Sequence, residues 1–191
     1  MTNFLIIWID LLIMIKKIIK FIFKLGVGFL TVSLFLVVLY KFFDPPVTPL
    51  MIERVTASIV KDEEPRLDRK WKNLHEISKN LIKSAIASED ARFFQHHGID
   101  WEAVEEAREY NRRHKKKVRG ASTITMQTAR NVFLWHDVSY VRKGLEVYFT
   151  YVIDFIWGKK RILDMYFNIA EWGDGIYGAE AAARKYFNKP A

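Results

Sequence analysis

The stretch EISKNLIKSAIASEDARFFQHHGID (76–100) indicates a helical fold. Apolar residues recur at every third or fourth position in its first half, which predicts a helix with one buried face. Gly98 is the expected helix stop, and Asp100 is the expected N-cap of the next helix. Glu89 and Asp90 stand where the apolar pattern ends. Neighbouring helix residues point about 100° apart, so these two carboxylates cannot act side by side on one substrate atom.

The sequence after this stretch is also dominated by helical patterns. Helices are expected over 101–111, 123–133, 140–157 and 159–170, followed by a turn over 173–178 and a last helix from 179. Ser122 is the expected N-cap of the helix at 123–133. The segment 140–157 is apolar on almost every side, which indicates a helix that is buried or touches lipid. Strand alternation and internal repeats are not evident, so the fold class is mainly α.

The N-terminal 43 residues differ from the rest of the chain. Residues 21–43 are predominantly apolar and would span roughly 34 Å as a helix, enough to cross a bilayer. The expected organisation is a cytoplasmic or interfacial segment (1–20, with an interfacial helix over 4–15), a single transmembrane helix (21–43), a stiff linker (44–50) and an outer domain (51–191). A cleaved signal peptide is the alternative, but Lys41 and FFDPP (42–46) replace the small residues of a cleavage site.

Lysines decide the expected orientation. Lys16, Lys17, Lys20 and Lys24 precede the uncharged stretch 25–40 of the transmembrane helix, so the positive-inside rule places the N-terminus in the cytoplasm and the outer domain outside the plasma (inner) membrane. The net charge of +8 favours an anionic partner, and the absence of cysteine excludes disulfides. The basic loop 112–119 lacks interleaved aromatic residues and would face away from the cytoplasm. It therefore indicates anionic lipid head groups rather than nucleic acid.

Four stretches in series resemble the peptidoglycan glycosyltransferases, which polymerise lipid II and also form the first domain of bifunctional penicillin-binding proteins. They are SEDARFFQHHGID (88–100), RGASTITMQTARN (119–131), RKGLE (142–146) and KKRILDMYFNIAEWGDGIYGAEAAARKYF (159–187). With the N-terminal anchor, they are most similar to the monofunctional biosynthetic transglycosylases. The resemblance covers about residues 45–191 and implies a lysozyme-like helical domain. Relatives continue beyond KYFNKPA (185–191), so the chain is expected to be C-terminally incomplete.

The resemblance implies a role for Glu89 as the general base that deprotonates the 4-hydroxyl of the acceptor sugar. Such a base is needed because the reaction forms a glycosidic bond while displacing a lipid-linked pyrophosphate. The alternative is an ordinary carboxylate at a helix end. Further substrate-binding positions implied by the resemblance are Asp90, Phe93, His96 and Asn168. His96 and His97 lack metal-type spacing, so a structural or positioning role is expected rather than metal ligation.

Glu146 matches the second glutamate of the family, which supports the pyrophosphate side directly or through a divalent cation. A carboxylate in an otherwise apolar helix is costly unless it is paired or used. Arg142 lies four positions earlier, so an i,i+4 ion pair is the alternative. No cofactor is expected to be obligatory, and Mg²⁺ or Mn²⁺ at the pyrophosphate is an optional addition.

The second motif predicts the leaving-group site. A helix N-terminus at Ser122 would present free N–H groups to a phosphate, and Arg130 would add a fixed charge. The resemblance assigns the pyrophosphate to Ser122, Gln127, Arg130 and Lys143. A capped surface helix is the alternative. Val138 replaces an arginine of some relatives, so Arg130 and Lys143 are expected to carry more of the binding.

These observations together predict an inverting glycosyltransferase that elongates β-1,4 glycan strands from lipid II and the growing lipid-linked chain. Transpeptidases and other divisome proteins are candidate partners, and peptidoglycan synthesis for cell shape is the expected process. Two alternatives belong to other classes. One is a lytic transglycosylase or muramidase of lysozyme-like fold, which would not need the lipid anchor or the cationic site. The other is a non-catalytic membrane scaffold.

Overall fold

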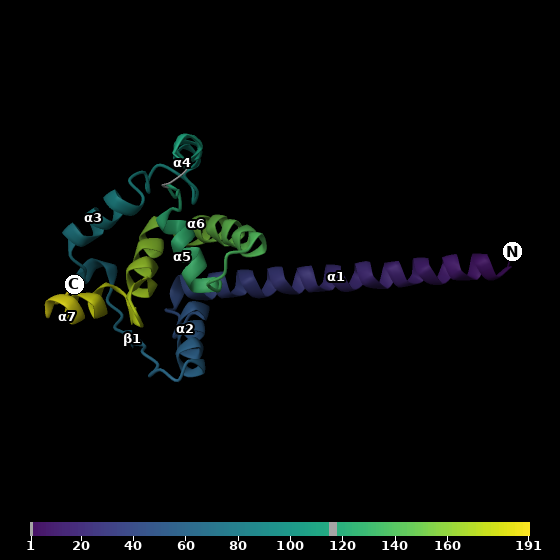
Figure 1. Ribbon diagram of the computed structural model, residues 1–191, viewed down its shortest axis with the longest axis horizontal. Helices are drawn as coiled ribbons and strands as arrows, with labels where there is room; N and C mark the ends of the chain where they lie inside the picture. Colours follow the sequence, from purple (N-terminus) through teal and green to yellow (C-terminus); the bar gives the residue numbers. More distant parts are fainter. Residues whose placement is uncertain (1, 115–117) are drawn as a thin grey trace. The chain divides into compact units, whose positions relative to one another are not determined.

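The computed structural model describes residues 2–114 and 118–191, which form two compact units, Met1–Phe42 and Phe43–Ala191 (Figure 1). The first unit is one helix, α1 (Thr2–Phe42). Its segment Leu12–Phe42 is long and apolar enough to cross a membrane, with a mean hydropathy of 2.4. The helix expected over 4–15 is not a separate element, because α1 continues through Asp10 and the lysines. These residue types lower hydropathy without breaking a helix.

The second unit is mainly helical, as the sequence predicts. Its elements, in chain order, are α2 (Pro49–Val60), β1 (Asp68–Arg69), the 3₁₀ turn η1 (Leu74–Glu76), α3 (Lys79–Glu89), α4 (Trp101–Arg113), α5 (Ile124–Phe133), α6 (Tyr140–Ile169), β2 (Glu171–Gly173), β3 (Ile176–Tyr177) and α7 (Ala179–Phe187). The predicted basic loop 112–119 begins only after Arg113, and residues 115–117 lie outside the described residues.

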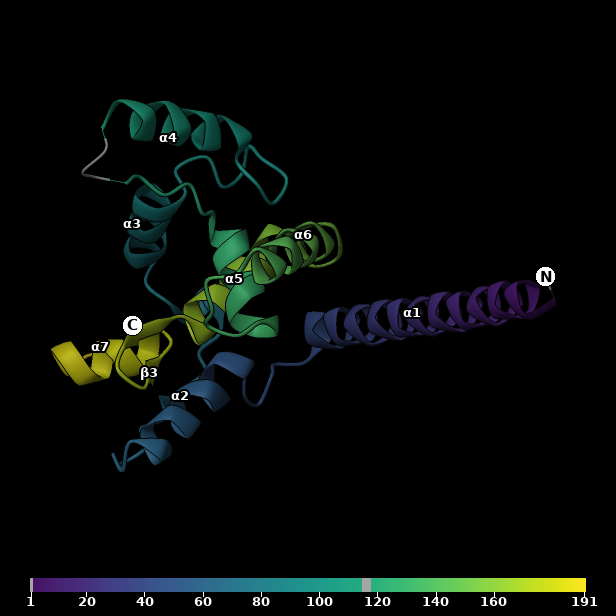
Figure 2. The same ribbon diagram turned by 45° about the vertical axis from the view of Figure 1, so that its right-hand side comes forward.

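Helix α5 is the central element of this unit. It lies beside α6 in both views and also contacts α2 (Figures 1 and 2). Most of its residues are buried, which is why its sequence is apolar or small on nearly every side. The rings of Phe133 and Phe149 stack in parallel with their centroids 4.5 Å apart, joining the end of α5 to α6. This packing holds the site-bearing face of α5 in a fixed direction.

Gly158 divides α6 into the two helices that the sequence predicts. Its φ of 73° and ψ of 165° are non-helical, so the chain changes direction between 140–157 and 159–169. An L-residue seldom adopts a positive φ, whereas glycine does so readily. The kink therefore has a local cause that is readable in the sequence.

A small sheet was not predicted. Its strand order is β1-β3-β2, with β1 parallel and β2 antiparallel to β3. Strands of two or three residues are too short to show an alternating pattern, and the pairing of β1 with β3 joins segments about a hundred residues apart. The predicted turn over 173–178 contains the end of β2, the tight connection to β3, β3 itself and the N-cap of α7.

Two local predictions about caps and stops are wrong. Thr123, not Ser122, is the N-cap of α5, because its Oγ1 accepts a hydrogen bond from the backbone N–H of Met126 at 3.1 Å. Gly98 does not stop a helix, since α3 already ends at Glu89. Gly98 instead has φ +81° at a close approach to α6. The expected cap at Asp100 is confirmed: its Oδ1 accepts from Ala103 N at 2.9 Å.

Candidate active site

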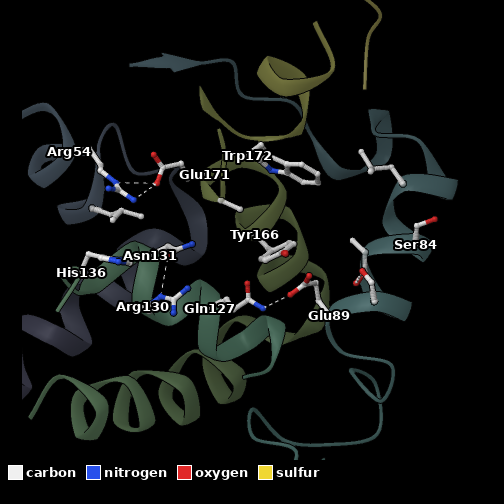
Figure 3. A pocket seen from close by; sticks show the side chains of 15 residues that line it. Arg54, Ser84, Glu89, Gln127, Arg130, Asn131, His136, Tyr166, Glu171 and Trp172 are labelled. Carbon is white, nitrogen blue, oxygen red and sulfur yellow. Dashed lines mark hydrogen bonds and ion pairs between the residues drawn. The ribbon is translucent and has the colours of Figure 1, made fainter. Parts of the chain in front are cut away.

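A cleft of about 610 Å³ opens on the outer unit and brings together residues from α2, α3, α5, α6 and β2 (Figure 3). Its lining is Leu50, Arg54, Leu81, Ser84, Ala85, Ser88, Glu89, Gln127, Arg130, Asn131, His136, Tyr166, Ala170, Glu171 and Trp172. Three of the predicted site residues, Glu89, Gln127 and Arg130, are therefore in one cleft. They reach it from two helices that are separated in the sequence by α4.

Glu89 and Gln127 face each other across this cleft. Glu89 is the last residue of α3 and is exposed. Gln127, in the first turn of α5, donates a hydrogen bond from Nε2 to Oε2 of Glu89 at 2.9 Å (Figure 3). The amide fixes the direction of the carboxylate but does not neutralise its charge. Glu89 is thus an accessible and oriented proton acceptor.

Asp90 has the opposite environment from its neighbour. It is buried, and its Oδ2 accepts from Ile124 N at 3.0 Å while its Oδ1 lies 2.9 Å from His96 Nε2. The first contact satisfies a free N–H at the start of α5, and a negative charge there is favoured by the helix dipole. Asp90 thereby joins the end of α3 to the start of α5. This contact sets the position from which Glu89 enters the cleft.

Arg130 supplies positive charge to the same cleft. It lies one turn after Gln127 on α5, so both side chains are on one helix face. Its Nε contacts Oδ1 of the buried Asn131 at 3.4 Å. Arginine is always charged and carries several donors in a planar group, which suits a phosphate. A carboxylate and a guanidinium thus face the same space.

Tyr166 of α6 contributes a hydroxyl group between these charges (Figure 3). Burial, reinforced by the negative charge of Glu89, raises the pKa of Tyr166 to about 12. The phenol therefore stays protonated at neutral pH and can donate a hydrogen bond. Tyr166 lies within the fourth motif of the sequence. Its helical periodicity alone predicts a packing role in the core and not a place in the cleft.

A second cavity of about 450 Å³ adjoins the first and shares Ser88 and Glu89 with it. Ser122 lines this second cavity, together with Gly120 and Ala121 of the segment before α5. Glu89 thus stands between two spaces, one with Arg130 and one with Ser122. The structure does not bring Ser122 and Arg130 into one cavity, as the predicted pyrophosphate site requires.

Glu146 and Lys143 do not line the cleft. Glu146 is buried, with Oε2 bonded to Arg142 and Oε1 to Lys143 Nζ at 2.5 Å. This is the helical ion pair that the sequence left open as the alternative, with a second cation added. Both carboxylate oxygens are engaged, so this conformation offers no free acceptor. The catalytic role of Glu146 and the binding role of Lys143 stay predictions, and the structure shows the two side chains paired with each other.

Three further residues that were predicted to contact substrate lie in the interior. Phe93 is fully buried, with Lys159 Nζ 4.7 Å from the centre of its ring. The His96 side chain is only 9% exposed and faces Asp90. Asn168 is 1% exposed, and its amide accepts from Lys72 N at 2.8 Å and donates to Lys72 O at 2.9 Å. These three residues do not line the cleft, and their contact with substrate stays a prediction.

Asp90, His96 and Asp100 offer potential metal ligands within 4.8 Å of one another. Their carboxylates already have partners, since Arg92 donates to both oxygens of Asp100 at 2.8 and 3.0 Å. Burial alone would raise the pKa of Asp100, but the hydrogen bonds from Arg92 and from the backbone N–H of Ala103 outweigh it and lower the pKa. The group is an interior network of hydrogen bonds and ion pairs.

Sequence reasoning missed Arg54, His136, Glu171 and Trp172 as cleft residues. Arg54 Nε and NH2 lie 3.2 and 3.1 Å from Oε2 of Glu171. Glu171 and Trp172 stand in the fourth motif without a role of their own, and Arg54 and His136 lie outside all four motifs. For Arg54, the only local signal is its place one turn after the buried Leu50 in α2.

Known proteins are similar to this chain over most of its length. The family model described as transglycosylase matches residues 55–191. A biosynthetic peptidoglycan transglycosylase of Rhodospirillum centenum is 50% identical over 166 residues, covering 87% of this chain and 68% of that protein. The protein of the same description from Bdellovibrio bacteriovorus is 47% identical over 172 residues, covering 90% and 68%. Another from Bacteroides thetaiotaomicron is 44% identical, covering 93% and 71%.

Proposed function

The chain belongs to the transglycosylase family, and from this membership we propose how its cleft carries out the reaction. The protein is a glycosyltransferase of peptidoglycan synthesis. We propose lipid II and the growing lipid-linked glycan chain as its substrates. The proposal is supported by a cleft that holds an accessible carboxylate and a guanidinium, which are the two groups that the transfer requires.

Glu89 is proposed as the general base. Its carboxylate accepts the proton of the acceptor 4-hydroxyl as that oxygen attacks C1 of the donor sugar. The bond between C1 and the pyrophosphate oxygen breaks in the same displacement, so the α-linked donor gives a β-1,4 product. Gln127 orients the carboxylate through its 2.9 Å hydrogen bond. Asp90 keeps the end of α3 in place through its bond to Ile124 N, and it lines the adjoining cavity beside Glu89.

Arg130 is proposed to stabilise the charge that develops on the leaving pyrophosphate. A preorganised donor at a developing charge lowers the barrier because it needs no reorganisation during the reaction. Tyr166 is a second donor in the same cleft, and its raised pKa keeps it protonated. Ser122 is proposed to contact substrate in the adjoining cavity, on the other side of Glu89.

A divalent cation such as Mg²⁺ or Mn²⁺ does not fit the residues of this cleft. Such ions prefer several free oxygen ligands. The two carboxylates that line the described part of the cleft, Glu89 and Glu171, are bonded to Gln127 and Arg54, and they come from separate elements. Glu146 is occupied by Arg142 and Lys143. We therefore derive no step through a metal.

We further propose that α1 anchors the protein with its N-terminus in the cytoplasm and the outer unit in the periplasm. The support is the long apolar segment Leu12–Phe42 and the lysines near its start. This side of the membrane is where transpeptidases that cross-link glycan strands would act. They are proposed as partners on that ground.

The observation that carries the proposal is the exposed, oriented carboxylate of Glu89 beside Arg130. The test is Glu89→Gln, which keeps size and hydrogen bonding but cannot accept the proton. Polymerisation of labelled lipid II should fall by about 10²-fold or more. Glu63→Gln, an exposed glutamate outside the cleft, is the matched control.

Product analysis separates the alternative classes in the same experiment. A wild-type protein that cleaves finished glycan without polymerising lipid II would be a lytic enzyme. A wild-type protein that does neither would be a scaffold. Retention of full polymerisation by Glu89→Gln would show that another group is the base.

A further inference from the structure

Arg54 and His136 are two potentially cationic side chains that line the cleft. Neither the four motifs nor the helical periodicity marks them as site residues. Arg54 comes from α2, just before the segment 55–191 that matches the transglycosylase family. His136 lies in the connection between α5 and α6. In Figure 3 both lie on the side of the cleft away from Glu89, with Arg130 and Asn131 between. The cleft therefore has Glu89 on one side. Arg54, His136 and Arg130 lie toward the other side, where Glu171 is paired with Arg54.

The dipeptide Glu53-Arg54 organises that side of the cleft. Glu53 Oε2 accepts a hydrogen bond from the backbone N–H of His136 at 2.7 Å, which fixes the connection after α5. Arg54 lies one turn after Leu50, and both side chains line the cleft, as expected for residues i and i+4. The helix start is itself fixed by the cap at Thr48 and by Pro49. Two adjacent residues thus set the positions of both cations.

The bond between Arg54 and Glu171 is of a kind that an anionic ligand can replace. Two of the three guanidinium nitrogens, Nε and NH2, lie near one oxygen, Oε2, at 3.2 and 3.1 Å. The Arg54 side chain is 45% exposed, and ion pairs at such positions are weak because water competes for both charges. A phosphate carries more charge and more acceptor oxygens than a carboxylate and suits the forked donors of arginine. Glu171 therefore serves as a replaceable partner.

We propose that Arg54 and His136, together with Arg130, bind the diphosphate of the lipid-linked sugar. Arg54 leaves Glu171 and bonds the diphosphate, and His136 donates a ring N–H to it. This inference rests on the proposed function, in which Glu89 is the base on the other side of the cleft. It places the negative leaving group away from the carboxylate, where repulsion between the two is lowest. Lys143 is bonded to Glu146 and does not line the cleft, so Arg54 and His136 take over its expected role.

Binding is measured by calorimetry on the full chain in detergent, with inorganic pyrophosphate and farnesyl pyrophosphate as the two probes. Arg54→Ala should weaken the binding of both probes by about tenfold or more, since bonds to charged groups are the strong ones. Arg54→Lys should recover part of the affinity, because it keeps the charge without the fork. His136→Ala should weaken binding by a smaller factor. Lys61→Ala, at the exposed end of the same helix, is the control and should bind as the wild type does.

Glu171→Gln should change the affinity for the diphosphate in the opposite direction from Arg54→Ala. If Glu171 is a replaceable partner, removing its charge should tighten the binding of farnesyl pyrophosphate, because Arg54 is then released more easily. The glutamine oxygen can still accept from Gly175 N, which Glu171 Oε1 contacts at 3.3 Å, so the turn should be retained. If the ion pair is only structural, Glu171→Gln should leave affinity unchanged or weaken it, and the proposal is then wrong.

The remaining outcomes also decide the question. Arg54→Ala with wild-type affinity and an unchanged melting temperature would overturn the proposal. Binding of inorganic pyrophosphate without farnesyl pyrophosphate would overturn the assignment to a lipid-linked ligand. Because these are binding measurements, they do not depend on turnover. A wild-type protein that shows the predicted Arg54 dependence but fails to polymerise lipid II would contradict the proposed function and not the anion site.

Discussion

At the scale of single residues, the neighbours Glu89 and Asp90 differ in exposure and therefore in role. Glu89 ends α3 and is exposed in the cleft, whereas Asp90 is buried with φ −161° and ψ 70°. The break in helical geometry at Asp90 turns its side chain toward Ile124 and His96. The carboxylate of Asp90 therefore forms hydrogen bonds within the protein, whereas the carboxylate of Glu89 is accessible to a ligand in the cleft.

Asp90→Asn should reduce the stability of the protein, with a smaller and indirect effect on the rate of polymerisation. The amide has one acceptor oxygen instead of two and cannot serve both Ile124 and His96 as the carboxylate does. We expect a loss of about 1–3 kcal/mol in the free energy of unfolding, the usual range for a buried polar group left unsatisfied. Urea denaturation measures it, with Glu63→Gln as the exposed control. An unchanged unfolding midpoint beside abolished polymerisation would instead make Asp90 the reacting group.

At the scale of elements, the contact between Gly98 and α6 holds the turn after α3. Gly98 has φ +81°, and a Cβ there would lie 2.9 Å from Thr150 Cγ2. Thr123 Oγ1 donates to Gly98 O at 2.5 Å, so the same glycine also meets the start of α5. Two elements, α5 and α6, thus meet at a residue without a side chain. Their approach positions α5 relative to α3 and so the two sides of the cleft.

Gly98→Ala should destabilise the outer unit by about 1–3 kcal/mol, because it combines a disfavoured φ with a steric clash. Gly158→Ala separates the two causes, since Gly158 has φ +73° but no neighbour within 4 Å of a built Cβ. Gly120→Ala has open space and should be nearly neutral. Adding Thr150→Ser to Gly98→Ala should recover the steric part, as measured by melting temperature. Equal melting temperatures for Gly98→Ala and Gly120→Ala would show that the close approach is unimportant.

At the scale of the whole molecule, the linker is part of the outer unit and not a free spacer. Arg161 NH1 lies 2.9 Å from Asp44 Oδ1, and Arg69 NH1 donates to Pro46 O at 2.8 Å. Both guanidinium groups stack on Trp71, at 5.0 and 5.8 Å from the ring centre. The start of the unit is therefore bonded to α6 and to the small sheet. The chain leaves it at a fixed point.

A fragment that begins at residue 44 should fold and still bind lipid. The outer unit is compact by itself, and α6 and the connection before it expose large apolar side chains: Val138, Tyr140, Val141 and Phe155. Exposed apolar groups of this kind favour insertion into a membrane surface. Flotation with anionic liposomes measures the binding, and Phe155→Ser should reduce it. Polymerisation should be slower than in the full chain. A fragment that stays wholly in the aqueous fraction would contradict a membrane-facing α6.

Acid should destabilise the outer unit through Glu180. Burial would raise its pKa, but hydrogen bonds from Ala191 N, Lys72 and Arg184 outweigh this and lower the pKa from 4.5 to about 2. A lowered folded-state pKa contributes stability that is present above the unfolded-state value and is lost as pH falls toward the folded-state value. Stability should therefore decrease between about pH 4.5 and 2. Urea unfolding at several pH values measures this decrease, and Glu180→Gln should reduce its slope. An identical slope in that variant would assign the acid sensitivity to other groups.

The sequence by itself determined the helical class, the apolar N-terminal helix, the cap at Asp100, the division of α6 at Gly158 and the four motifs. These features are local, because periodicity, capping and glycine geometry act over a few neighbouring residues. It also placed Glu89, Gln127 and Arg130 among the site residues through the resemblance. The three lie together because α3 and α5 are joined through Asp90.

Only the tertiary structure decided which charged residues face the cleft. Glu146 has the sequence context of a site residue, yet its neighbours Arg142 and Lys143 use both of its oxygens. Arg54 and His136 have no motif, yet α2 brings them to the cleft through contacts that span 117 and 83 residues. The direction of a side chain and the partner it meets depend on packing between distant segments. No local pattern of residues records that packing.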